Sequence, residues 1–128
     1  MNGVAFYFFL VAVFCVTGGM AWGIQMAISG EHLFAPAHAH LNLVGWATMG
    51  LFGLYYHSVP AAAARGLAKA HFVIALVGVV LMVPGIALAV SEKSEAVVAA
   101  GALVTFASML VFLYTVATNR TGSSSAPP

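Results

Sequence analysis

Long apolar runs are the feature that most limits how this chain can fold. A helix that crosses a bilayer needs roughly 20 mostly apolar residues. Four successive runs meet that length, namely Val4–Ile28, Ala37–Val59, Leu67–Val90 and Ala96–Ala117. The segments between them are short, so consecutive helices are expected to be antiparallel neighbours. The sequence therefore predicts an all-α integral membrane protein, a four-helix transmembrane bundle over residues 1–118.

The composition agrees with a membrane protein. Only 5% of the residues are charged, whereas soluble domains carry about 25%. The net charge of +1 is too small to indicate a nucleic-acid partner. The apolar runs and the few charged residues instead predict a lipid bilayer as the surroundings, of the bacterial inner or plasma membrane type. Residues 119–128 end in Thr-Gly-Ser-Ser-Ser-Ala-Pro-Pro, which predicts a disordered tail.

The few basic residues predict an orientation. Arg65 and Lys69 flank the second connection, and Arg120 follows the fourth run, so all three fall on one side of a four-helix arrangement. Cytoplasmic segments carry an excess of Lys and Arg. Both termini are therefore expected in the cytoplasm. The first and third connections, with His38 and His40 close to the first, are then expected near the outer surface.

His38 and His40 stand at the start of the second apolar run. A histidine inside a bilayer is costly and is by default a candidate functional residue. At 100° per residue the two rings point about 200° apart around a helix, so they cannot bind one ion from one side. The pattern suits a planar cofactor on each flank, or one cofactor shared with another helix, and imidazole is a common axial ligand of haem iron. The alternative is a pair of interfacial histidines that bond to loops or lipid headgroups.

A longer motif surrounds these histidines. The run from His38 to Trp46, His-Ala-His-Leu-Asn-Leu-Val-Gly-Trp, continues to Tyr55-Tyr56 and then Pro60. It resembles the tenth helix of the catalytic subunit of heme-copper oxidases, with the C-type branch most similar. His71-Phe72, with a glycine seven residues after His71, resembles the eleventh helix of that subunit. The resemblance covers about residues 36–90.

The resemblance implies haem b as the cofactor. His38 matches the ligand of the family's high-spin haem, and His40 matches a ligand of its low-spin haem. The family's twelve core helices form three similar sets of four, and this chain looks like one set. The low-spin haem takes its other histidine from a different set. We therefore expect a homo-oligomer, a homotrimer first and a dimer as the alternative, with haem between neighbouring second helices.

Departures from the family limit the expected chemistry. The family's copper site uses a His-His pair, which this sequence does not contain, and His57 follows Tyr55-Tyr56 at the other end of the helix. Copper-dependent oxygen reduction is therefore not expected. His57 and His71 are expected at similar depth on two sides of one hairpin, and they are weaker candidates for a second iron site. Their alternative role is that of ordinary residues near helix ends.

Three further residues are candidate cofactor contacts. Asn42 follows His38 by four residues and can orient that ring or bond a haem propionate, although buried amides also simply join helices. Trp46 can stack on a porphyrin or pack in the core. Lys93 is the one cation expected at the outer surface, where it can pair with a propionate or remain a solvated loop charge.

These residues together predict a membrane protein for electron transfer, or for redox or gas sensing, through histidine-ligated haem b. One alternative is a small oxidase-like or reductase-like enzyme with a five-coordinate haem. Another is a haem or copper carrier, or an assembly partner of an oxidase. The sequence identifies no electron donor, acceptor or substrate.

Overall fold

The computed structural model describes residues 1–120, of which 86% are helical, and no strand occurs among them. In chain order the elements are α1 (Gly3–Ser29), α2 (Ala35–His40), the π-helix η1 (Leu41–Thr48), α3 (Met49–Ser58), α4 (Pro60–Ala63), α5 (Gly66–Val90) and α6 (Ala96–Thr118). The all-helical prediction is confirmed over this part of the chain. Most of the predicted tail, residues 121–128, lies outside the described residues.

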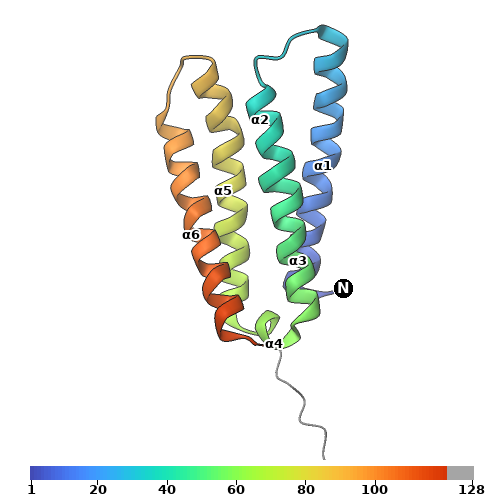
Figure 1. The fold of residues 1–128 in the computed structure, drawn as a ribbon, viewed down its shortest axis with the longest axis vertical. Coiled ribbons are helices and arrows are strands. Elements are labelled where there is room, and N and C mark those ends of the chain that lie inside the picture. Colours follow the sequence, from blue (N-terminus) through green and yellow to red (C-terminus); the bar gives the residue numbers. More distant parts are fainter. Residues whose placement is uncertain (121–128) are drawn as a thin grey trace, which may run out of the picture.

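Three elements join end to end into one column. The residues at the junctions, Leu41, Thr48 and Met49, all have right-handed helical backbone angles, so α2, η1 and α3 continue without a break. Figure 1 shows this column between α1 and α5, with α6 packed on α5. The N-terminus and α4 lie at one end of the molecule, and the α1–α2 and α5–α6 connections lie at the other (Figure 1).

The helices α1, α5 and α6 are each long and apolar enough to cross a membrane. Their bounds differ by at most one residue from the runs predicted for them. Large apolar side chains cover their outer faces, and Phe14, Ile28 and Leu103 are all more than two-thirds exposed. Such surfaces are suited to lipid, because soluble monomers rarely expose large contiguous apolar patches.

The column differs from the regular α-helix that the sequence predicts. Directly after His40 the backbone widens into the π-helix Leu41–Thr48. Within it the Thr48 hydroxyl donates a hydrogen bond of 2.9 Å to the Leu43 carbonyl, five residues earlier. Runs of π-helix are rare and often mark functional sites. The candidate haem ligands therefore stand just before a change in helical pitch.

Glycines bring α5 and α6 into direct contact. A Cβ atom added at Gly85 would lie 2.6 Å from the backbone nitrogen of Val98, and one at Gly101 would lie 2.6 Å from that of Met82. Backbone cannot move aside as a flexible side chain can. The close approach of the two helices therefore depends on these glycines, as in many membrane helix pairs.

Candidate functional site

His38 faces α1 and packs against it. Its ring lies edge-on to Trp22, with ring centres 6.2 Å apart. A Cβ atom added at Gly23 would be 3.2 Å from the His38 Cε1 atom, so the absence of a side chain at Gly23 leaves room for the ring. Asn42 occupies the equivalent position one turn further, directly against Gly19. The glycines of α1 thus form a shallow seat for His38 and Asn42.

His38 and Asn42 also contact each other. The Asn42 side-chain nitrogen lies 3.3 Å from the His38 Nε2 atom, so the amide can donate to the ring. The other ring nitrogen, Nδ1, is buried and has no hydrogen-bond partner among the described residues. Because Nε2 is engaged with Asn42 and the ring is packed on α1, His38 would have to move to bind a ligand on another face.

His40 is held differently. Its Nδ1 atom lies 2.8 Å from the carbonyl oxygen of Pro36, one turn earlier on the same helix. A carbonyl only accepts, so Nδ1 carries the hydrogen, and in the neutral ring the lone pair remains on Nε2. The ring is half-buried. A ligating histidine is commonly oriented in this way, by donating its second N–H to a backbone carbonyl.

The other two candidate contacts lie apart from this pair. Trp46 is half-buried, edge-on to Phe9, and it lines an apolar groove of about 280 Å³ together with Ala47, Gly50, Leu51 and Leu54. Lys93 is exposed in the connection between α5 and α6. That connection lies at the same end of the molecule as the start of α2 (Figure 1).

A second histidine centre involves partners that the sequence did not reveal. His71 of α5 is completely buried, with its Nδ1 atom 2.9 Å from the Tyr56 hydroxyl of α3. Its Nε2 atom lies 3.1 Å from the Ser108 hydroxyl of α6. Both ring nitrogens are therefore in hydrogen bonds that join three helices.

Aromatic rings enclose His71. The ring centres of Phe52, Phe8 and Phe112 lie 4.6, 5.1 and 5.7 Å from that of His71. Tyr56 belongs to the oxidase-like motif, but nothing in the sequence assigned it or Ser108 as a partner of His71. The only signal available from the sequence was an ionisable residue inside an apolar run.

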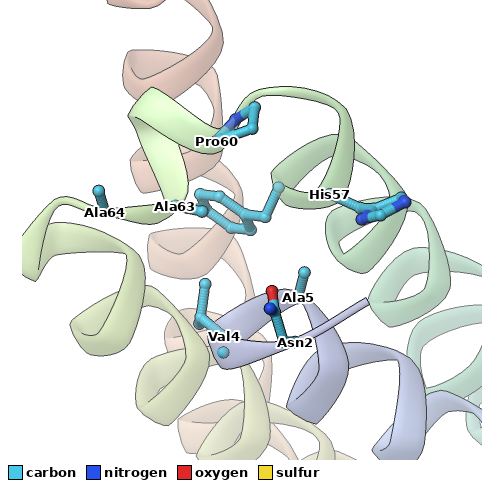
Figure 2. Close-up of a pocket in the computed structure, with 9 residues that line it drawn as sticks. Asn2, Val4, Ala5, His57, Pro60, Ala63 and Ala64 are labelled. Atoms are coloured by element: carbon cyan, nitrogen blue, oxygen red, sulfur yellow. The ribbon is translucent and has the colours of Figure 1, made fainter.

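His57 does not join His71 in a common site. It is exposed and lines a cavity of about 410 Å³ between the start of α1 and α4. Figure 2 shows Val4 and Ala5 on one side of that cavity and Pro60 and Ala63 on the other. Because both nitrogens of His71 are already hydrogen-bonded, the geometry does not support the iron site expected from His57 and His71.

Comparisons with known proteins identify no relative of this chain. No protein family, no curated protein and no solved structure matches the chain. The resemblance to heme-copper oxidases therefore has no support beyond the sequence motif. Within residues 1–120, no group of three or more His, Cys, Asp or Glu side chains is placed to hold a metal ion.

Proposed function

We propose that this chain is a membrane haem b-binding protein in which His40 supplies an axial nitrogen. The observation that carries the proposal is the 2.8 Å hydrogen bond from His40 Nδ1 to the Pro36 carbonyl, which leaves Nε2 free on a half-buried ring. A haem held by two histidines takes one imidazole from each side and not a cluster of ligands, so a single well-oriented histidine per helix would fit it. The sequence resemblance to heme-copper oxidases supports the same ligand.

The proposal includes a membrane arrangement. In it the α2–η1–α3 column crosses the bilayer together with α1, α5 and α6, giving a bundle of four spans. Both termini and the Arg65 connection face the cytoplasm, because the basic residues Arg65, Lys69 and Arg120 gather at that end. His40 then lies near the outer surface, at the start of its span.

The second axial ligand comes from a second copy of the chain. From His40 to His57 is 17 residues, or roughly 25 Å along a helix, too far for one iron. His38 is turned toward α1 and bonded to Asn42. His40 of each copy is therefore the nitrogen most readily offered, and two copies of the same residue meet only across a two-fold axis. This favours a homodimer. A homotrimer instead requires His38 to leave Asn42 and serve as the partner ligand.

Electron transfer is the activity we propose. Bound haem b would supply reversible one-electron chemistry, and holding it by two histidines would favour electron transfer over gas binding. The chain's own contribution is to fix the ring plane and the protonation of His40 through Pro36. The electron donor and acceptor are membrane or extracytoplasmic redox partners of unassigned identity.

Optical spectroscopy of the purified protein tests this proposal. We expect the spectrum of a six-coordinate b-type haem that does not change when carbon monoxide is added to the reduced protein. His40→Ala should remove most of the haem. His32→Ala is the matched control, because His32 is exposed in the α1–α2 connection and bonds a backbone carbonyl in the same way, at 2.9 Å from Gly30. Wild-type haem content in His40→Ala would refute the assignment, and carbon monoxide binding would favour the five-coordinate alternative.

A further inference from the structure

Tyr56, His71 and Ser108 form a continuous chain of hydrogen-bonding groups across the interior. The chain runs from the Tyr56 hydroxyl through both nitrogens of His71 to the Ser108 hydroxyl, with separations of 2.9 and 3.1 Å. All three side chains are buried, at 1%, 0% and 3% exposure. Burying polar groups in an apolar interior is costly unless they are paired, and paired chains of this kind inside membranes often carry protons.

The hydrogen bonds that join Tyr56, His71 and Ser108 can point in either of two directions with the same positions of the heavy atoms. In the first, the Tyr56 hydroxyl donates to Nδ1 of His71, and Nε2–H donates to Ser108. In the second, Ser108 donates to Nε2, and Nδ1–H donates to Tyr56. Hydroxyls can act as donor and acceptor, and a neutral imidazole has one nitrogen of each kind. Passing one proton along the chain converts the first direction into the second.

A cavity lies beside the residue at each end of this hydrogen-bonded series. Tyr56 lines the cavity of about 410 Å³ between α1 and α4. Asn2, His57 and Pro60 also line this cavity (Figure 2). Ser108 lines an inner cavity of about 20 Å³, together with Thr48 and Thr105. That volume is enough for one water molecule. The Thr105 hydroxyl is buried there without a hydrogen-bond partner among the described residues, and it could bond such a water.

We propose that Tyr56, His71 and Ser108 are a proton relay between these two cavities. A proton from the cavity between α1 and α4 binds the Tyr56 oxygen while the phenol's own proton moves to His71 Nδ1. The Nε2 proton of the ring then passes to the Ser108 oxygen, and the proton that Ser108 held passes to water in the inner cavity. One proton enters and one is released, so Tyr56, His71 and Ser108 are neutral before and after, and the water of the inner cavity carries the charge until the reverse passage returns a proton. This inference does not rest on haem binding.

Hydrogen exchange at the His71 ring tests the relay. The full chain, labelled with ¹⁵N-histidine and reconstituted in phospholipid vesicles, is transferred to deuterated buffer, and the loss of the ring N–H signal is followed by NMR. Absence of the signal in His71→Asn identifies it. We expect the protection of the ring N–H, measured against free imidazole, to be at least about tenfold lower than the protection of the backbone amides of α5 around it, which report local opening of the helix. Equal protection of the ring and of those amides would overturn the relay in favour of a sealed structural network.

Two substitutions establish where protons enter. Tyr56→Phe removes the hydroxyl of the residue that lines the cavity between α1 and α4, and it should slow exchange at the His71 ring about tenfold. Ser108→Ala removes the hydroxyl that accepts the Nε2 proton and should also slow ring exchange about tenfold, because that proton then has no acceptor. Tyr55→Phe is the control, because the buried hydroxyl of the neighbouring Tyr55 has no hydrogen-bond partner among residues 1–120. Unchanged ring exchange in Tyr56→Phe, or slowing in Ser108→Ala alone, would overturn the entry of protons through the cavity between α1 and α4.

Discussion

The Nδ1 atom of His40 donates a 2.8 Å hydrogen bond to the carbonyl oxygen of Pro36, four residues earlier on the same helix. His38, only two residues away, instead bonds the side chain of Asn42 and packs against Trp22 of α1. Adjacent members of one motif thus have separate environments. One is fixed inside the helix bundle, and the other keeps a free nitrogen on a half-buried ring.

His40→Gly should produce a haem-deficient protein that free imidazole restores. The glycine variant leaves space beside the Pro36 carbonyl, so added imidazole can occupy the position of the missing ring. We expect millimolar imidazole to recover most of the six-coordinate spectrum after incubation with haem. His32→Gly should bind haem without added imidazole. Recovery that is equal with and without imidazole would show that His40 is not a ligand.

Gly19→Ala should disturb the His38–Asn42 pair. A methyl group at Gly19 would collide with the Asn42 side chain, which can rotate away only by giving up its contact with His38. The expected loss is about 1 kcal/mol, the usual net value of one hydrogen bond. Gly18→Ala is the matched control, since a Cβ atom there meets nothing within 4 Å. Unfolding in detergent measures both, and equal stability of the two variants would contradict the prediction.

Tyr56→Phe and Tyr55→Phe should differ in stability although they remove the same group from neighbouring residues. The first leaves the buried Nδ1 of His71 without a partner and should cost about 1–3 kcal/mol. The second removes a buried hydroxyl that has no hydrogen-bond partner in the described part of the chain, so the expected change is zero or slightly stabilising. Thermal unfolding followed by circular dichroism compares the two. A larger loss in Tyr55→Phe would show that the hydrogen bond to His71 contributes little.

The helices were predictable because a long apolar run leaves the backbone few choices in a membrane. With no water to satisfy N–H and C=O groups, a spanning segment must be helical. The predicted bounds of α1, α5 and α6 accordingly agree with the structure to within a residue. The π-helix Leu41–Thr48 was not predicted, because nothing in its residue types distinguishes it from an α-helix.

The contacts inside the bundle were harder to predict. Helices that are apolar on all sides carry little information about which face turns inward. The junction of Tyr56, His71 and Ser108 depends on how α3, α5 and α6 are rotated about their axes, so it had no sequence signal. The proximity of Asn42 to His38 was predictable, because a spacing of four residues places side chains on the same face of a helix.

Reporter fusions test the proposed orientation. A fusion after Ala63, in α4, and a fusion at Pro128 should both show cytoplasmic activity, and one after Glu31 should show activity outside. Ala63 is in α4 and Glu31 is in the α1–α2 connection, which lie at opposite ends of the molecule (Figure 1), so the two fusions must give opposite results in a chain that crosses the membrane along its long axis. A cytoplasmic Glu31 fusion would reverse the orientation and place His40 near the inner surface.

The number of chains that share one haem distinguishes the dimer from the trimer. If His40 of two copies ligate the same iron across a two-fold axis, the solubilised assembly has twice the 13.2 kDa mass of one chain and contains one haem. Co-expression of wild-type and His40→Ala chains adds a sharper measure. Because each haem then needs two intact His40 residues, the haem content should fall as the square of the wild-type fraction.

A trimer predicts a different dependence. If each haem there takes His40 from one chain and His38 from its neighbour, only one of the two ligands is lost with each variant chain, and the haem content falls in proportion to the wild-type fraction. Asn42→Ala, which frees His38, should then increase haem binding, whereas in the dimer it should leave binding unchanged. A haem-loaded monomer with two histidine ligands would contradict both assemblies, because the geometry of one chain gives His40 no second histidine at its own depth that is free of other contacts.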